Sequence, residues 1–376
     1  MTGAASAEAS LERVERVAAE LRERELDVLL VATVVNLRYL TGFTGSSGLA
    51  LIAAEGAESA RTVRHRFLTD FRYETQSAEQ VPASFEREIV AGNLLEAAVA
   101  SLGAASGRLG FDETSVTVSE HARLRELLSA RWELVPCGGI VERLRAVKDA
   151  GEIARIRAAT ELSEQALTSV LEAGIVDRTE RDVAIELELG MRRLGAMAPS
   201  FPSIVAAGAH GALPHAEPRE QEIPPDVLVT IDWGALHEGY CSDCTRTYAT
   251  GAGISTQARE VYELVRSAQE QGLAAVKSGP TGRELDAVAR AVIEGAGHGE
   301  HFGHGLGHGV GMEIHEGPRL SRTAGEEPLR AGNVVTIEPG AYLPGRLGVR
   351  IEDLVVVTND GCEVLTNLSK ALTVVS

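Results

Sequence analysis

The sequence predicts a mixed α/β (α+β) chain of two domains, residues 1–143 and residues 144–376. Its 376 residues are more than one domain usually holds and are comfortable for two. Short apolar runs separated by helical or turn segments fill the first part, which indicates a self-contained α/β unit. The second part contains the order helix, helix, strand hairpin twice, which indicates two related halves that close around one site.

The first domain is predicted to open with an amphipathic helix and to continue with short strands. One face of the helix is apolar, formed by Leu11, Val14, Val17, Ala18 and Leu21. Four apolar runs predict strands: DVLLVAT, GLALIAA, RFLTD and RLGFD, at 27–33, 48–54, 66–70 and 108–112. The segment LRAVKDAGEIARIR, from Leu144, predicts the start of a long helix and marks the domain boundary.

Capping patterns mark the second helix of each half in the second domain. One helix ends near AGIVDRT and the next opens at TERDVAIELELGMRRLG, where Thr179 stands three residues before Asp182. Another ends near VKSGPT and the next opens at TGRELDAVARAVIEGAG, with Thr281 before Glu284. A strand hairpin that carries two acids follows each helix pair: Asp232 and Asp243, then Glu338 and Glu352.

The first of these hairpins raises an electrostatic problem. VLVTID and GYCSDCTRTYA read as two strands. If the turn between them centres on His237 and Glu238, Asp232 and Asp243 lie directly opposite each other on one face. Like charges that face across a ladder are destabilising, so something must compensate them or one must be protonated.

A histidine-rich stretch, HFGHGLGHGVGMEIHEGP, lies between the acids of the two halves. Its histidines are His301, His304, His308 and His315. The glycines make a regular helix improbable and allow the backbone to pass close to a neighbour while histidines project. The alternative is a glycine-rich loop with solvent-facing histidines.

The four hairpin acids and one histidine together favour a pair of metal ions. Four ionised carboxylates bring a charge of −4, which two divalent cations balance. Oxygen-rich ligation with one nitrogen and no thiolate suits manganese, cobalt, iron or zinc. Such a pair polarises a carbonyl and activates water. The alternative is a set of salt-bridged strand acids with Arg246 or Arg350 as partners.

These stretches resemble a known family. IDWGALHEGYCSDCTRT, GHGLGHGVGMEIHEGP, TIEPG and VRIED, in this order, resemble the pita-bread metallopeptidases. ALPHAEP, YLTGF and TDFRYETQ are similar to the two-domain group of aminopeptidase P, prolidase and creatinase. The resemblance implies a creatinase-like N-terminal α/β domain and a pita-bread catalytic domain with pseudo-twofold helix–helix–hairpin halves.

The resemblance also implies an activity and a set of site residues. The activity is that of a metallo-exopeptidase that hydrolyses Xaa–Pro bonds at the N-terminus of peptides or in dipeptides, with two divalent ions, Mn²⁺ first and Co²⁺, Zn²⁺ or Fe²⁺ as alternatives. The implied metal ligands are Asp232, Asp243, His308, Glu338 and Glu352. Glu338 would also carry the proton, and the other implied catalytic residues are His215, His304 and His315. Arg350 stands two residues before Glu352 and shares its strand face, so we expect it to orient that carboxylate.

Two departures from the relatives concern His210, where many carry asparagine, and Cys244, where an aliphatic residue is common. No arginine is assigned to a dipeptide's carboxylate, although Arg346 is a candidate, so aminopeptidase P and prolidase activity both stay open. Two rival hypotheses are a creatinase-like amidohydrolase on this scaffold and a non-enzymatic pita-bread binding protein. The resemblance implies a homodimer whose N-terminal domain, through TGFTGSSG and its neighbours, acts as a lid.

Charge and cysteine content narrow the partners and the compartment. Lys and Arg total 36 against 54 Asp and Glu, a net charge of −18, which disfavours nucleic acid and anionic membranes. We expect no membrane span and no signal peptide. Four cysteines are too few to staple the chain and favour the cytoplasm, and we interpret Cys241 and Cys244 as two small buried residues on opposite strand faces.

Overall fold

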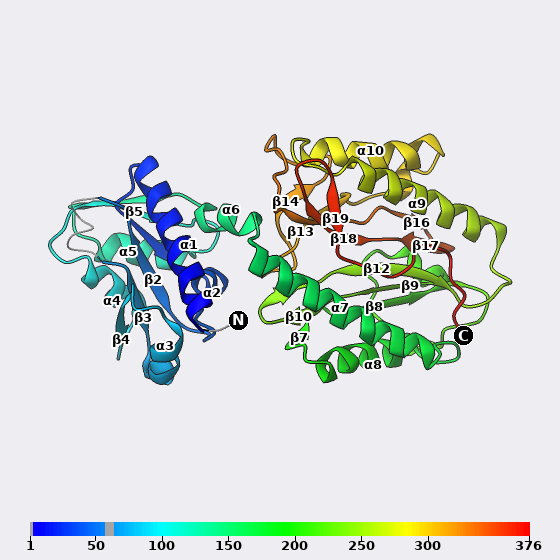
Figure 1. Ribbon diagram of the computed structural model, residues 1–376, viewed down its shortest axis with the longest axis horizontal. Helices are drawn as coiled ribbons and strands as arrows, with labels where there is room; N and C mark the ends of the chain where they lie inside the picture. The colour runs from blue at the N-terminus through cyan, green and yellow to red at the C-terminus, as the bar shows by residue number, and fades with distance from the viewer. Residues whose placement is uncertain (1–2, 57–63) are drawn as a thin grey trace. The chain divides into compact units, whose positions relative to one another are not determined.

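The structure is a computed structural model that describes residues 3–56 and 64–376 (Figure 1). The chain divides into two compact units between Arg145 and Ala146, and both units combine helices with strands. The predicted mixed α/β class is therefore confirmed. No helix in these described ranges is long and apolar enough to cross a membrane.

A six-stranded sheet forms the centre of the first unit. Its order is β4-β3-β2-β1-β5-β6. The strands are β1 (Val28–Val31), β2 (Leu49–Ala53), β3 (Arg66–Thr69), β4 (Glu86–Ile89), β5 (Gly107–Phe111) and β6 (Trp132–Pro136). The four predicted runs are β1, β2, β3 and β5. The prediction missed β4 and β6 because these edge strands are largely exposed or half-buried and lack an apolar run.

Helices accompany this sheet in the first unit. They are α1 (Gly3–Glu23), α2 (Val34–Thr41), α3 (Glu74–Gln80), α4 (Leu94–Ser101), α5 (Val118–Leu127) and α6 (Ile140–Ala146), with the 3₁₀ helix η2 (Phe71–Tyr73). In α1, Val14, Val17, Ala18 and Leu21 are buried as predicted. Leu11 is 42% exposed and lies at the edge of the apolar face.

The long helix predicted from Leu144 begins later than expected. The chain first completes α6 and then starts α7 (Ala150–Glu172). Asp149 caps α7 in a complete capping box with Glu152, which fixes the start of the helix at Ala150. The prediction took two helices for one because the apolar pattern continues across the break.

Two helix pairs flank the strands of the second unit (Figure 1). The first pair is α7 and α8 (Glu180–Arg193), and the second is α9 (Thr256–Ala275) and α10 (Gly282–Gly295). The Thr179 side chain accepts a hydrogen bond from the Asp182 amide, and Thr281 forms a complete capping box with Glu284. The predicted starts of α8 and α10 are therefore confirmed.

The strands of the second unit form four small sheets. In the first half the orders are β12-β9-β8 and β11-β10-β7; in the second half they are β14-β13-β15-β18-β19 and β16-β17. First-half strands are β7 (Ala198–Pro199), β8 (Ile204–Ala207), β9 (Leu228–Trp233), β10 (Ala235–His237), β11 (Tyr240–Cys241) and β12 (Cys244–Ala249). Second-half strands are β13 (Gly307–Gly309), β14 (Glu316–Leu320), β15 (Val334–Ile337), β16 (Gly340–Leu343), β17 (Leu347–Arg350), β18 (Asp353–Val357) and β19 (Cys362–Val364). The 3₁₀ helices are η3 (Gly208–Ala212) and η4 (Gly299–His301).

The register of the first hairpin corrects one expectation. Asp232 pairs with Thr245, not with Asp243. The reason is the turn, which centres on Glu238 and Gly239 because both have positive φ, as a two-residue hairpin loop requires. Since Asp243 lies two residues before Thr245, it shares the face of Asp232 but sits diagonally from it.

The second hairpin places its two acids across from each other. Ile337 pairs with Asp353, and Gly340 pairs with Arg350. Both pairs obey one register, which puts Glu338 opposite Glu352 at the break between the two ladders. The facing arrangement that was expected of the aspartates thus occurs for the glutamates.

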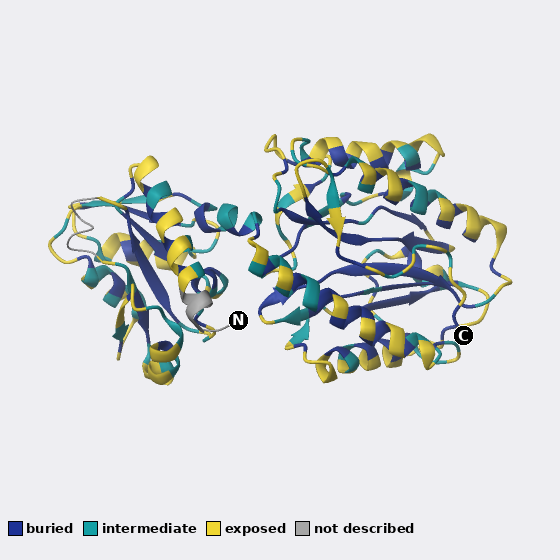
Figure 2. Cartoon of the chain, in the orientation of Figure 1, coloured by how far each residue is buried: buried dark blue, intermediate teal, exposed yellow. Residues whose placement is uncertain are grey.

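The strands of the second unit are mostly buried and form much of its core. Exposed residues line the outer faces of α8, α9 and α10 (Figure 2). Cys241 packs with Ile156 and Val310, whereas Cys244 packs in the cluster of Trp233. Both are buried in different apolar clusters, which confirms their interpretation as packing residues on opposite strand faces.

Candidate metal centre

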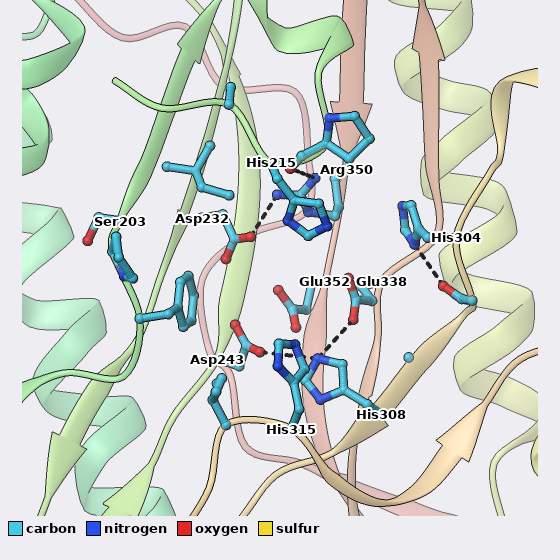
Figure 3. Close-up of a pocket in the computed structure, with 18 of the residues that line it drawn as sticks. Ser203, His215, Asp232, Asp243, His304, His308, His315, Glu338, Arg350 and Glu352 are labelled. Carbon is cyan, nitrogen blue, oxygen red and sulfur yellow. Dashed lines mark hydrogen bonds and ion pairs between the residues drawn. The ribbon is translucent and has the colours of Figure 1, made fainter. Parts of the chain in front are cut away.

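A cavity of about 460 Å³ in the second unit collects all the predicted site residues. Carboxylates, imidazoles and one guanidinium converge on it from both halves (Figure 3). They are Asp232, Asp243, His308, Glu338 and Glu352, together with His215, His304, His315 and Arg350. Phe201, Pro202 and Ile314 supply apolar walls.

Strand ends position the five predicted ligands. Asp232 lies within β9, and Asp243 stands immediately before β12. Glu338 directly follows β15, and Glu352 directly precedes β18. His308 lies in β13. The first half therefore contributes the aspartates, and the second contributes the glutamates and the histidine.

Glycines allow β13 to fit between its neighbours. A Cβ on Gly307 would lie 2.1 Å from the Thr336 carbonyl oxygen, and one on Gly309 would lie 2.2 Å from the Gly317 carbonyl oxygen. Only hydrogen fits at these two positions, so the strand passes close to β15 and β14 and presents His308 to the cavity. The predicted close approach of a non-helical backbone is confirmed.

The ligand atoms lie within the reach of a small cation cluster. Oxygen atoms of Asp232, Asp243 and Glu352 all lie within 4.8 Å of one another. His308 Nε2 lies 3.3 Å from Glu338 Oε1 and 3.6 Å from Asp243 Oδ2. His308 Nδ1 lies 3.1 Å from the Gly309 carbonyl oxygen, which can only accept; in the neutral ring Nδ1 then carries the hydrogen and Nε2 keeps its lone pair for a cation.

Burial and mutual repulsion make the acids resist ionisation in the absence of cations. Burial, followed by the charges of Glu352 and Glu338 among others, raises the pKa of Asp243 well above its ordinary value. Burial and the charges of Glu338 and Asp232 do the same to the pKa of Glu352. Burial also raises the pKa of Asp232, although Arg350 opposes this.

Glu338 differs from the other three acids. Burial again opposes its ionisation, but the hydrogen bond from His308 and the charges of His308, His304 and Arg350 lower its pKa to about 2. Of the four acids, Glu338 is therefore the one held ionised by the protein's own cations and donors. The other three need protons or external cations.

Two carboxylate oxygens indicate that external cations, and not protons, neutralise these acids. Asp232 Oδ1 and Glu352 Oε1 are buried and have no hydrogen-bond partner within residues 3–56 and 64–376. An orphaned buried carboxylate oxygen costs about 1–3 kcal/mol or more unless a cation meets it. Four carboxylates and one imidazole are a donor set that divalent metals accept, so the residues fit a pair of such ions.

The salt-bridge alternative applies to one acid. Arg350 Nη2 donates to Asp232 Oδ2 at 2.7 Å. Arg246 pairs instead with Asp353, which lies outside the cluster. Arg350 also donates through Nε to Thr245 Oγ1 at 3.0 Å and through Nη1 to the Tyr342 hydroxyl at 2.8 Å. It therefore orients Asp232, whereas the prediction attached it to Glu352, two residues away in the chain.

Tyr342 and Thr245 belong to the site and were missed by the sequence analysis. The Tyr342 hydroxyl lies 2.8 Å from His304 Nε2 and so links that histidine to Arg350. Thr245 Oγ1 donates to Glu352 Oε2 at 2.8 Å. Strand alternation was the available signal, because Thr245 stands two residues after Asp243 and Tyr342 four after Glu338.

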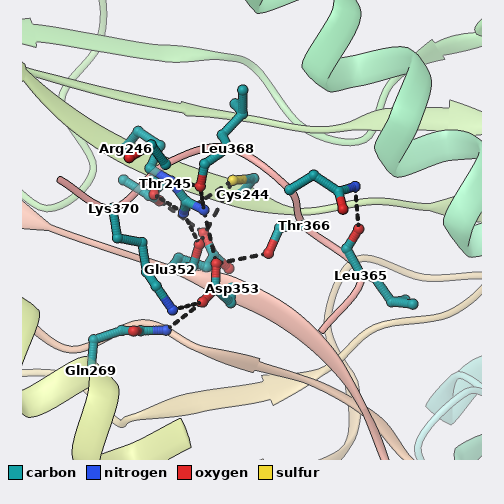
Figure 4. Close-up of polar contacts among 12 residues, drawn as sticks. Cys244, Thr245, Arg246, Gln269, Glu352, Asp353, Leu365, Thr366, Leu368 and Lys370 are labelled. Carbon is teal, nitrogen blue, oxygen red and sulfur yellow. Dashed lines mark hydrogen bonds and ion pairs between the residues drawn. The ribbon is translucent and has the colours of Figure 1, made fainter. Parts of the chain in front are cut away.

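A buried polar network supports the backbone at Glu352 (Figure 4). Arg246 Nη1 donates to the Glu352 carbonyl oxygen, and Nη2 donates to Asp353 Oδ1 at 2.8 Å. Asp353 also accepts from Thr366 at 2.7 Å and from Gln269 at 2.8 Å. The network therefore fixes the backbone at Glu352, while the Oε1 atom of its carboxylate has no partner within the residues that the structure describes.

The remaining histidines have different surroundings. The His315 ring lies 4.3 Å from the His308 ring, edge to face, whereas His215 is exposed on the loop after η3. His301 pairs with His298 and does not line the cavity, which corrects its inclusion in the histidine cluster. Arg346 and His210 do not line it either, so His210 does not change the pocket directly.

The fold and the acidic site are those of a two-domain metallopeptidase, and comparison with known proteins makes this specific. The family described as metallopeptidase family M24 matches residues 154–359, and the creatinase/prolidase N-terminal domain matches residues 13–147. An uncharacterized peptidase of Bacillus subtilis is 40% identical over 350 residues, which cover 92% of this chain and 95% of the relative. The chain belongs to metallopeptidase family M24.

Two solved structures are similar over almost the whole chain. A Xaa-Pro dipeptidase from Bacillus anthracis is 38% identical with a TM-score of 0.90, and the match covers 97% of this chain and 99% of that one. An X-Pro aminopeptidase from Thermotoga maritima is 35% identical with a TM-score of 0.83, and the match covers 93% and 97%. The predicted two-domain architecture, a creatinase-type domain followed by a pita-bread domain, is therefore confirmed.

Proposed function

We propose that this chain is a metallo-exopeptidase that hydrolyses Xaa–Pro bonds in small peptides. The observation that carries the proposal is the group of four buried or half-buried carboxylates with His308, in which two carboxylate oxygens lack a partner among the described residues. The names of the similar structures support the substrate class. The ligands we propose are Asp232, Asp243, His308, Glu338 and Glu352.

A pair of divalent ions held by these residues would polarise the scissile carbonyl and activate a water molecule for attack. Manganese is our first choice, with cobalt, zinc or iron as alternatives, because the donor set is rich in oxygen and has no thiolate. The protein's own contribution is to fix the donors in place before the metals arrive. Thr245 and the Arg246 network do this for Glu352, and Arg350 does it for Asp232.

Glu338 is the proposed proton carrier. It is the one acid of the four whose pKa lies below its ordinary value, and as a carboxylate beside the proposed water it can accept a proton and return it to the leaving nitrogen. The prolyl nitrogen has no hydrogen in the peptide, so its departure requires that proton. His215 and His315 line the cavity as donors for the substrate, and His304, held by Tyr342, lines the proposed proline side.

The proposal includes both dipeptidase and aminopeptidase activity, because one similar structure is a Xaa-Pro dipeptidase and the other is an X-Pro aminopeptidase. The assay must exclude a creatinase-like amidohydrolase and a non-enzymatic binding protein. We further propose a homodimer in which the N-terminal unit restricts substrate length, and a cytoplasmic location, which the low content of four cysteines favours.

A metal-dependent peptide assay tests the proposal. The protein is stripped with a chelator, dialysed and assayed with Mn²⁺ or Co²⁺ on Leu-Pro, Leu-Pro-Ala and the non-prolyl pair Leu-Ala and Leu-Ala-Ala. We expect no turnover without metal. With metal, we expect kcat/KM to be at least tenfold higher for Leu-Pro than for Leu-Ala, or for Leu-Pro-Ala than for Leu-Ala-Ala. Equal rates on prolyl and non-prolyl peptides would sink the substrate class. No hydrolysis of any peptide would favour the amidohydrolase or the binding protein.

Variants separate the site from the rest of the chain. Asp243→Ala and His308→Ala should each abolish turnover while the circular dichroism spectrum stays that of the wild type. Glu363→Gln is the matched control because it removes an exposed ion pair with Arg157 and lies outside the cavity. Activity that survives either site substitution would show that the ligands are wrongly assigned.

A further inference from the structure

One carboxylate outside the cavity receives an unusual number of donors. Glu180 is the first residue of α8 and is 1% exposed. It accepts hydrogen bonds from the Ala207 amide at 2.9 Å, from the Arg219 amide at 3.0 Å and from His210 Nδ1 at 2.9 Å. The Arg219 guanidinium adds a two-pronged contact, with Nε and Nη2 each at 3.0 Å.

These donors come from the two ends of a single loop. Ala207 ends β8 and His210 lies in η3, just before the loop residues Leu213 to Pro218, and Arg219 follows them. The loop carries His215, which lines the cavity. Glu180 itself does not line it. A single buried carboxylate thus joins the entry and the exit of the segment that presents His215.

The chain after Arg219 is attached to the same helix start. The Arg181 amide donates to the Arg219 carbonyl at 3.0 Å, and the Glu180 amide donates to the Gln221 carbonyl at 3.1 Å. This part of the exit is therefore held by backbone bonds that do not need the Glu180 side chain. The entry at η3 has no equivalent bond to α8 other than those of the Glu180 carboxylate, within the residues that the structure describes.

Two further contacts hold η3 and the start of the loop. A Cβ on Gly348 would lie 1.8 Å from the Gly211 carbonyl oxygen, so β17 and η3 touch at a point where only glycine fits. Arg350 Nη1 donates to the Pro214 carbonyl oxygen at 3.2 Å. Because Arg350 also holds Asp232, the loop is tied to the acidic cluster on one side and to Glu180 on the other.

We propose that Glu180 is a positioning residue that sets the geometry of His215 by clamping both ends of its loop. The proposal rests on the role that the proposed function gives to His215. It also assigns His210: this histidine belongs to the clamp, not to the substrate pocket. Asparagine, the residue that the family resemblance leads one to expect there, retains an amide donor, so both residue types can serve the clamp.

The physical basis is the geometry of the donors. A carboxylate has two oxygens with about four lone-pair positions, and here the guanidinium fork, two backbone amides and an imidazole share them. Glutamine has the same shape but only one acceptor oxygen, and its amide hydrogens face donors. Glu180→Gln therefore breaks the clamp with little change in volume.

Hydrogen exchange tests the clamp without reference to activity. Full-length wild type, Glu180→Gln and the control Glu220→Gln are loaded with Mn²⁺ and compared by exchange mass spectrometry. Glu220 lies one residue after Arg219 and forms an exposed pair with Arg181, so its change leaves the clamp intact. We expect at least tenfold faster exchange in residues 208–219 for Glu180→Gln alone, with β9 and β15 unchanged. Unchanged exchange in that segment would overturn the proposal.

A double-mutant cycle tests whether the clamp acts through His215. We expect Glu180→Gln to lower kcat at least tenfold in the wild-type background and less than twofold in the His215→Ala background, at equal metal content. Equal losses in both backgrounds would mean a general structural effect and would overturn the proposal. His210→Asn should keep kcat within about threefold of the wild type.

Two results call for a different step. If Glu180→Gln does not fold, Arg219→Met replaces it, because it removes the guanidinium and keeps the backbone bonds; the same two expectations and the same two refutations apply. If the wild type cleaves no Xaa–Pro peptide, the proposed function fails, while the exchange experiment still decides whether Glu180 holds the loop.

Discussion

At the scale of the residue, the clustered acids of the site are stable only if their negative charges are neutralised. Asp243 and Glu352 are buried close to two other acids, and a buried like-charge group is stable only when protons or cations neutralise it. The cationic groups that pair directly with these acids are the Arg350 guanidinium, at Asp232, and the His308 imidazole, at Glu338 and Asp243. The balance of the charge must come from outside the chain, which is the physical reason to expect metal ions there.

The sequence predicted these residues better than it predicted their contacts. All nine predicted site residues line one cavity. The hairpin pattern pointed to the four acids and strand alternation to Arg350, whereas the individual histidines were assigned from the family resemblance. Tyr342 and Thr245 were missed because their roles depend on partners from other strands: His304 and Arg350 for the tyrosine, Glu352 for the threonine. A single sequence does not contain those pairings.

Asp243→Asn should separate metal binding from folding. Asparagine keeps the shape and removes a charge that the metal-free site must neutralise, so the metal-free variant should melt no lower than the metal-free wild type. Addition of Mn²⁺ should raise the melting temperature of the wild type, since a ligand at about a hundred times its Kd adds about 2.7 kcal/mol. The variant should lose most of that rise. Differential scanning calorimetry with and without Mn²⁺ measures both effects, and an unreduced rise would remove Asp243 from the ligand set.

Glu180 should make the stability of the chain depend on pH in the acid range. Burial opposes its ionisation, but the donors from Arg219, Ala207 and His210 outweigh burial and lower its pKa below the ordinary 4.5. Because the folded-state pKa is the lower one, its stabilisation is fully present above about pH 4.5 and is lost as the pH falls through the folded-state value.

Urea denaturation of metal-free wild type and Glu180→Gln between pH 3 and 7 measures this contribution. We expect the wild type to be more stable by about 1–3 kcal/mol above pH 5, the usual cost of disrupting a buried hydrogen-bonded carboxylate, and the difference to shrink toward pH 3. A difference that grew as the pH fell would contradict the lowered pKa.

At the scale of the element, capping residues predicted where two helices begin, but the strand register of the first hairpin could be predicted only from the exact position of its turn. The caps at Thr179 and Thr281 predicted the starts of α8 and α10. The predicted turn of the first hairpin was wrong by one residue. The structure gives Glu238 a positive φ, a conformation that this residue type seldom adopts, so the sequence did not indicate the turn there. A shift of the turn by one residue moves the facing pair by two, which is why Asp232 faces Thr245.

Gly307→Ala tests the close approach of β13 to β15. The added methyl would lie 2.1 Å from the Thr336 carbonyl oxygen, so the strands must separate and His308 must move. We expect a loss of about 1–3 kcal/mol in unfolding free energy, as for overpacking elsewhere, and at least tenfold weaker Mn²⁺ binding by calorimetry. Gly303→Ala is the matched control in the same stretch, because no atom lies within 4 Å of its added Cβ. Similar behaviour of the two variants would show that β13 does not need the glycine.

At the scale of the whole molecule, each unit has a core of its own. Val28, Leu51 and Leu109 belong to a cluster within the first unit, and Leu167, Val229 and Trp233 belong to one within the second. The proposed site lies entirely within residues 146–376. The first unit is therefore not needed to assemble the acids, and its proposed work is to form the dimer and to limit the length of the substrate.

The last prediction concerns that division of labour. Phe71 in η2 is 77% exposed on the first unit, although a phenylalanine that covers no partner leaves a large apolar surface in water. In full-length protein, Phe71→Ser should weaken the dimer, measured by light scattering across a concentration series, and should reduce the preference for Leu-Pro-Ala over a ten-residue Leu-Pro peptide. The control Val118→Ser changes an apolar residue that is 89% exposed elsewhere on the same unit and should leave both measurements unchanged.

A fragment of residues 146–376 should still bind Mn²⁺ and cleave the tripeptide, but as a monomer without length selection. If that fragment stays dimeric and selective, the first unit has neither role, and the dimer contact must lie on the catalytic unit.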